Sequence, residues 1–230
     1  MSLDDPELLE REYATSARLE RRRHNATGWV RGEEPWVEAL AAVAEMRPQR
    51  VLDAGCGDGV FARAVAAPVV VGIDSAAPMV DRARSRGIDA RQARIEDMPF
   101  ADGEFDVVVC NWVLYHLSDV EAGVRELARV LRPGGRFVGI YNRDRHMEEL
   151  WEQVRPASVE GDDYRGVLAR QFARVEERDT DAHTLWQTRD DLQAFLDASV
   201  ELLGPLEAPT KPYPFIVTRR NRVYVAEKAA

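Results

Sequence analysis

The chain has 230 residues, of which 45% are hydrophobic, with a formal net charge of −9 and a sequence pI of about 5.1. This length fits one domain with an appended cap better than two independent domains. The sequence has no run of about 18 apolar residues, so we expect no membrane span. The negative charge argues against nucleic-acid partners, whose binding proteins usually carry a basic field. The acidic start, MSLDDPELLERE, lacks the apolar core of a signal peptide, so we expect a cytoplasmic location.

Two helices are expected before the first strand. Residues 5–25 form a charged segment with a partial apolar stripe, and the sequence NATG at 25–28 breaks it. A second helix over about 34–46 has Pro35 in its first turn, where proline is favoured. We therefore expect residues 1–47 to form a helical lid, and residues 48–230 to form the core of a single domain.

The stretch VLDAGCGDG at 51–59 predicts a strand, a tight turn and the start of a helix over about 59–67. Glycines allow close approach of the backbone to a ligand, and a helix N-terminus offers free N–H groups, so the turn predicts a nucleotide-type cofactor site. The spacing G-x-G-x-G of Gly55, Gly57 and Gly59 differs from the G-x-G-x-x-G of dinucleotide folds. Asp53 would repel a pyrophosphate but attract an ammonium or sulfonium group.

A second acidic residue, Asp74, ends the apolar run 69–73 and lies 21 residues after Asp53. An acid at the tip of a second parallel strand is placed to accept both hydroxyls of a ribose. The alternative is that Asp74 only caps the helix that follows.

The rest of the chain continues the alternation of strands and helices. Expected elements are a helix over 77–86, a strand near 89–93, a strand over 105–110, a helix from Ser118 or Asp119 to Leu131 and a strand over 136–141. The pattern then weakens, with a short helix over 147–154, a strand over 172–176, a helix over 190–202 and a last strand or strand pair within 214–227. Regular alternation predicts a parallel sheet with helices on both faces.

Four stretches, in this order and spacing, resemble the class I S-adenosylmethionine-dependent methyltransferases, in particular the subgroup known as methyltransferase type 11. They are VLDAGCGDG (51–59), VVVGIDSAAPMV (69–80), ARIEDMPFADGEFDVVVCNWVLYHL (93–117) and ELARVLRPGGRFVGIYN (126–142). The resemblance implies a Rossmann-like α/β fold with a seven-stranded, mostly parallel sheet, an antiparallel last strand and helices on both faces.

The resemblance also implies S-adenosylmethionine as cofactor and assigns the residues that bind it. These are Asp53, Gly55, Cys56 and Gly57 at the methionine end, Asp74 and Ser75 at the ribose, Met79 against the adenine ring, Ile95 and Glu96 at the adenine edge, and Asn111 at the tip of the fourth strand. One position departs from the family, because Arg94 stands where an acid often accepts from the adenine amino group. Arginine has donors only, so Glu96, Asp97, water or a backbone carbonyl would have to replace that acid.

His116 is the candidate general base, because it lies near the expected position of the transferred methyl group; its alternative role is packing at a loop–helix junction. Such a base is needed only if the acceptor is protonated when it attacks. Other residues considered for the acceptor side are His24, His146, Trp29, Trp112, Trp151, Arg31 and Arg143, whereas His183 is expected to be exposed. No C-x-x-C or H-x-x-x-H pattern predicts a metal site, and Cys56 and Cys110 are expected at strand tips lining one cleft.

We therefore expect a methyltransferase that acts on an O, N or C centre of a small molecule, as a monomer or homodimer, without nucleic-acid or membrane partners. An rRNA or protein acceptor is the alternative among enzymes. An NAD-dependent oxidoreductase is disfavoured by the glycine spacing. A non-catalytic cofactor-binding protein is supported only by Arg94.

Overall fold

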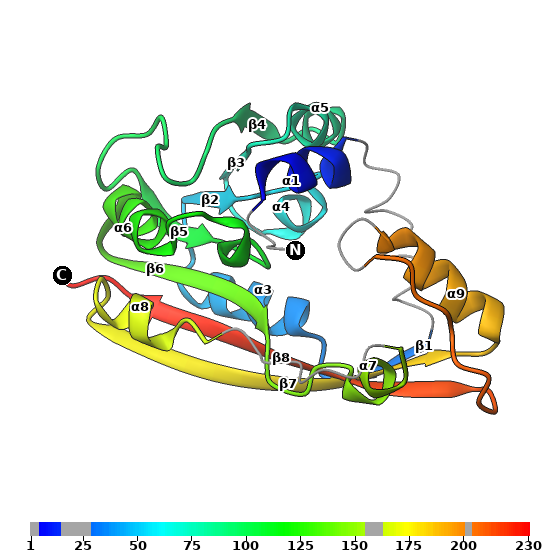
Figure 1. The fold of residues 1–230 in the computed structure, drawn as a ribbon. Helices are drawn as coiled ribbons and strands as arrows, with labels where there is room; N and C mark the ends of the chain where they lie inside the picture. Colours follow the sequence, from blue (N-terminus) through cyan, green and yellow to red (C-terminus); the bar gives the residue numbers. More distant parts are fainter. Residues whose placement is uncertain (1–4, 15–28, 155–162, 201–203) are drawn as a thin grey trace.

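The computed structural model describes residues 5–14, 29–154, 163–200 and 204–230, and these form one eight-stranded sheet with helices packed on both faces (Figure 1). The strands are β1 (Trp29–Gly32), β2 (Arg50–Ala54), β3 (Val69–Asp74), β4 (Asp89–Gln92), β5 (Phe105–Val109), β6 (Leu131–Asn142), β7 (Arg174–Trp186) and β8 (Phe215–Glu227). The helices are α1 (Pro6–Tyr13), α3 (Pro35–Glu45), α4 (Val60–Ala64), α5 (Ala77–Ser85), α6 (Val120–Val130), α7 (Glu148–Val154), α8 (Arg165–Ala169) and α9 (Arg189–Ala198), with a 3₁₀ turn, η1, at Leu114–His116.

The strand order is β1-β7-β8-β6-β5-β2-β3-β4. Strands β2 to β6 pair in parallel, whereas β8 runs antiparallel to both β6 and β7. The Rossmann-like fold with a mostly parallel sheet and an antiparallel last strand is thus confirmed. The sheet has one strand more than expected, because β1 adds to the edge through antiparallel pairing with β7.

Alternation of side chains along the central strands builds a hydrophobic core on each face of the sheet. On β6, Phe137 and Tyr141 pack toward α6 and α8, whereas Val138 and Ile140 pack toward α3. All four side chains are fully buried. A strand that is apolar on both faces matches the expectation for the centre of a parallel sheet.

Several elements differ from their predicted bounds, most clearly the helix after β2 and the strand β7. The helix expected over 59–67 ends at Ala64, and Pro68 follows shortly before β3, where proline disfavours helical geometry in the residue ahead of it. Strand β7 extends to Trp186, and of the two alternatives expected within 214–227 the structure shows the single strand, β8. Each of these two strands supplies the hydrogen-bonding partner of the other, because β7 and β8 pair along their whole length, from Arg174 with Glu227 to Trp186 with Phe215.

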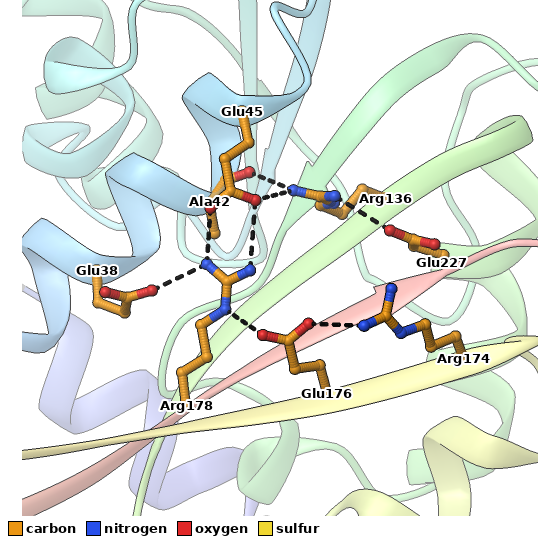
Figure 2. Close-up of polar contacts among 8 residues, drawn as sticks. All are labelled: Glu38, Ala42, Glu45, Arg136, Arg174, Glu176, Arg178 and Glu227. Carbon is orange, nitrogen blue, oxygen red and sulfur yellow. Dashed lines mark hydrogen bonds and ion pairs between the residues drawn. The ribbon is translucent and has the colours of Figure 1, made fainter.

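Helix α3 belongs to the core rather than to a lid, since it packs against β6 and β8. Figure 2 shows the ion pairs that hold it there: Arg178 of β7 reaches Glu38 and Glu45 at 2.9 Å each, and Arg136 of β6 reaches Glu45 at 2.7 Å. Arg136 also donates to the carbonyl of Ala42 at 2.9 Å. These contacts hold the C-terminal half of α3, and Glu38 nearer its start, against the sheet. Of the helix expected over 5–25, α1 is described and residues 15–25 lie outside the described ranges.

No helix among the described residues is both long enough and apolar enough to cross a membrane.

Candidate functional site

A cavity of about 1240 Å³ opens at the carboxyl ends of the parallel strands. It lies where the strand order reverses between β2 and β5, which is the usual ligand site of open α/β sheets. Its lining comes from the turn after β2, the tip of β3, residues 92–96, residues 111–118, the start of α3, and residues of α1, β8 and α9. Every cofactor residue expected from the sequence lines this cavity except Met79.

The turn after β2 is held by backbone hydrogen bonds from Gly55 and Cys56 to the carbonyl of Ile73, each 2.8 Å long. Gly55, Gly57 and Gly59 all have positive φ, at 78°, 52° and 78°. Gly55 is also sterically required, because a Cβ there would lie 2.4 Å from a methyl carbon of Val113. Gly55, Cys56 and Gly57 of this turn line the cavity, so a ligand there can approach the backbone closely; we call this turn the glycine cradle.

Asp74 links the tip of β3 to this turn. Its carboxylate accepts from the N–H of Gly57 and from the N–H of Ala76, both at 2.9 Å. Burial raises the pKa of this carboxyl, while the two N–H donors oppose that shift. Each carboxylate oxygen keeps a further lone pair, so Asp74 can hold the turn and still accept a ligand hydroxyl.

The adenine edge expected around residues 94–96 contains an ion pair. Arg94 reaches Glu96 at 3.0 Å, and the arginine side chain is 64% exposed whereas the glutamate is 15% exposed. Arg94 thus lies largely in solvent although it borders the cavity, and Glu96 places a less exposed carboxylate on the same lining. Met79 is fully buried on the core side of α5, and its neighbours Ala77 and Pro78 line the cavity in its place.

The two cysteines are buried thiols. The pKa of Cys56 is raised above its ordinary value by burial and then by the carboxylates of Asp53 and Asp74. Burial raises the pKa of Cys110 to about 12. Both groups therefore stay protonated near neutral pH, and only Cys56 lines the cavity; the expectation that both would do so is wrong for Cys110.

His116 lies on η1 and contacts α1. The hydroxyl of Tyr13 and Nε2 of His116 are 3.1 Å apart, and the two rings meet edge to face at 5.9 Å between centroids. Tyr115 packs against the same imidazole at 4.4 Å. All three side chains line the cavity. Helix α1 therefore contributes to the site through Tyr13, which lies 103 positions before His116 in the sequence.

His146 lines the cavity from the loop after β6. Its Nδ1 is 2.8 Å from the carbonyl oxygen of Arg220, which accepts only, so Nδ1 carries the proton. Burial lowers the pKa of His146 from 6.5 to about 4, and the ring is neutral at pH 7. His183 is exposed on β7, as expected, and His24 lies outside the described residues.

This neutral histidine predicts a pH dependence of stability. Between pH 6.5 and pH 4 the unfolded chain protonates His146 and the folded chain does not, so stability falls as the pH decreases. We expect a loss of roughly 2–3 kcal/mol in the free energy of unfolding across this interval. Urea titrations at pH 7 and pH 4.5 would measure this loss. The variant His146→Gln should lose less stability between these two pH values than the wild-type protein does. An equal loss in both proteins would contradict the low pKa of His146.

Of the other residues expected on the acceptor side, only some line the cavity. Trp151 packs with α9 in an apolar cluster and does not itself line the cavity, and the side chain of Trp29 is outside the described part. Arg143 is paired with Asp179 and Asp181 in a separate charged hollow, and Arg31 is exposed and does not line the cavity. Trp112 does line it, as expected.

The residues that sequence reasoning missed on this side are Trp36, Phe195, Arg219, Asn142 and Asn221, all of which line the cavity. Arg219 pairs with Glu34 at 3.4 Å. The available signal was the alternation along the polar stretch 218–222, which places residues 219 and 221 on one face of β8 once this stretch is taken as a strand.

The fold and the site define a Rossmann-like protein with a nucleotide-type cofactor cradle at the switch point of its sheet. Residues 52–139 match the family model described as a methyltransferase domain. This match and the fold together support a class I S-adenosylmethionine-dependent methyltransferase.

Individual relatives agree with this family. The chain is 40% identical over 109 residues to the uncharacterized methyltransferase YcgJ of Bacillus subtilis, covering 43% of each chain. The crystal structure of YcgJ superposes with a TM-score of 0.62 at 21% identity, covering 85% of this chain and 98% of that one. The N-methyltransferase NodS of Bradyrhizobium japonicum, solved with S-adenosylhomocysteine, has a TM-score of 0.56 at 18% identity, with 85% and 86% covered.

A further relative is the human probable tRNA methyltransferase 9B, which is 31% identical over 122 residues, or 50% of this chain and 27% of that protein. In sequence, the chain thus spans less than half the length of YcgJ and of the human protein.

The residues present fit the cofactor of this family, S-adenosylmethionine. Gly55 and Gly57 line the cavity with positive φ, so a ligand meets backbone there rather than a side chain. The buried Nδ2 of Asn111 has no hydrogen-bond partner among the described residues, while its Oδ1 accepts from the N–H of Ile140 at 3.0 Å. A bound ligand with an acceptor atom would satisfy that amide.

Proposed function

We propose that the protein transfers the methyl group of S-adenosylmethionine to a small-molecule acceptor, at an O, N or C centre. The observation that carries this proposal is the cavity of about 1240 Å³. It exceeds the roughly 300–1,000 Å³ of typical small-molecule sites. One part is the glycine cradle with its acidic residues, and another is lined by Trp36, Trp112 and Phe195. One cavity thus offers room for a cofactor and for an acceptor beside it.

In this proposal the residues have distinct tasks. Asp53, Gly55, Cys56 and Gly57 hold the methionine end, Asp74 and Ser75 accept the ribose hydroxyls, and Ile95, Glu96 and Asn111 complete the site; Met79 supports it from the core. The bound cofactor supplies an electrophilic methyl group on a sulfonium. The chain orients both ligands and excludes water, which is the protein's main contribution to such chemistry.

His116 is proposed as the base that takes a proton from the acceptor, with Tyr13 as the residue that orients its ring. We expect His116→Gln to lower kcat by about 10²–10⁴-fold on a hydroxyl acceptor, while cofactor affinity changes little. Tyr13→Phe should lower kcat less and shift the pH–rate profile, because only the orienting contact is lost. Unchanged turnover of His116→Gln on a true acceptor would remove this residue as the base.

The cofactor assignment is tested by calorimetric titration with S-adenosylhomocysteine, with NADH alongside. Micromolar binding of S-adenosylhomocysteine alone supports the proposal, and binding of NADH alone would replace it with an oxidoreductase. Isotope-labelled cofactor would then be incubated with small-molecule acceptors and, separately, with total tRNA. Labelling of tRNA alone would favour the nucleic-acid alternative, against which the charge of −9 argues.

A further inference from the structure

Three side chains in the cavity form a hydrogen-bonded chain. Nε1 of Trp112 donates to Oδ1 of Asn142 at 3.2 Å, and Nδ2 of Asn221 donates to the same oxygen at 3.0 Å. Asn142 and Asn221 are register partners on β6 and β8. All three residues line the cavity.

Which group donates and which accepts in this hydrogen-bonded chain follows from the chemistry of the three side chains. An indole nitrogen only donates, so Asn142 must present its oxygen, and that acceptor in turn requires the amide nitrogen of Asn221. Asn221 therefore keeps Oδ1 for another partner. No donor among the described residues reaches this oxygen, although the residue is only 1% exposed. A buried acceptor without a donor is costly, so a ligand that supplies one gains affinity here.

A purely structural alternative involves Thr180, the register partner of Asn221 on β7. Its hydroxyl is also buried without a partner among the described residues, and the residue does not line the cavity. A water between the two side chains would satisfy both. The role of Thr180 therefore separates a ligand site from a buried water site.

The surroundings of Asn221 favour an uncharged ligand. Because Nδ1 of His146 donates to the carbonyl of Arg220, Nε2 of the neutral ring is a second acceptor in the cavity. Arg219 and Glu34 pair with each other and leave no net charge. The ring systems of Trp36 and Phe195 line the same cavity and offer flat apolar contacts.

Building on the proposed function, we propose that Oδ1 of Asn221 is the hydrogen-bond acceptor that selects the methyl acceptor. The substrate class is an uncharged aromatic molecule with a hydroxyl or N–H donor, such as a phenol, an arylamine or an indole. Nε2 of His146 offers a second acceptor to the same molecule.

The test uses matched probes that differ in one donor: 2-naphthol with 2-methoxynaphthalene, and indole with 1-methylindole. Each is titrated into the complex with S-adenosylhomocysteine while the indole N–H signals are followed by NMR, with Trp112→Phe identifying the Trp112 signal. We expect the donor-bearing probe of each pair to bind about tenfold more tightly and to move the Trp112 signal. Asn221→Leu should remove this preference. If the leucine variant does not fold, Asn221→Ala is used in place of the leucine variant.

Thr180→Val is the matched control, because it removes a hydroxyl from the neighbouring strand and should leave the preference intact. Loss of the preference in Thr180→Val would mean that Asn221 serves a buried water, and this would overturn the inference. Equal affinities within each pair, a preference that survives in both Asn221 variants, or no binding of any probe would also overturn it. S-adenosylhomocysteine binding without donor preference refutes only this inference, whereas its failure to bind the wild-type protein refutes the proposed function.

Discussion

Replacement of Gly55 by alanine is expected to destabilise the protein by about 2–4 kcal/mol and to remove most of its affinity for S-adenosylhomocysteine. Two costs combine: the residue has φ of +78°, and its Cβ would lie 2.4 Å from one methyl carbon and 3.0 Å from the other methyl carbon of Val113. Either the turn or the segment after β5 must move, and both line the cavity. Urea unfolding and calorimetry would measure the two effects.

Gly87 provides a matched control for the cost of placing alanine at a positive φ. Its φ of +85° is similar, but a Cβ there would have no atom within 4 Å, so Gly87→Ala should show the conformational cost without the clash. The double variant Gly55→Ala with Val113→Ala should recover part of the lost stability. If Gly55→Ala is no worse than Gly87→Ala, close packing of this turn against Val113 does not matter.

The part of the cavity around the glycine turn was predictable because its signals are local. The glycine turn, Asp53 before it and Asp74 at the next strand tip are set by residues close in sequence, and parallel strands bring their carboxyl ends to one edge. Met79 is the exception. Its place on α5 depends on which side of that short helix faces the core, and there Ala77 and Pro78 took the cavity side.

The part of the cavity lined by β8 could not be predicted because non-local strand pairing decides its structure. Residues 218–222 carry three arginines and an asparagine, which allows a turn as readily as a strand. Only pairing of β8 with both β6 and β7 makes them a strand, and alternation then turns Arg219 and Asn221 to the cavity. Strand β1 was missed for the same reason, because its four residues form a strand through their antiparallel pairing with β7.

Asp74→Ala is expected to weaken S-adenosylhomocysteine binding by roughly 1–3 kcal/mol, about 5- to 150-fold in affinity, because the ribose hydroxyls would lose their acceptor. The substitution also frees the N–H groups of Gly57 and Ala76. Asp74→Asn retains one carbonyl oxygen and should lie between the wild-type protein and the alanine variant. Calorimetry would give the three affinities.

The exposed carboxylate of Asp89 on the neighbouring strand β4 supplies the control, since its side chain is 59% exposed and pairs with Arg91. Asp89→Ala should leave the affinity unchanged. Burial raises the pKa of Asp74, so wild-type affinity should begin to fall on acidification at a higher pH than an ordinary carboxyl would give, and Asp74→Asn should lack this dependence. Equal affinity of wild type and Asp74→Ala would show that the ribose is held elsewhere, and the role of Asp74 would then be limited to holding the glycine turn.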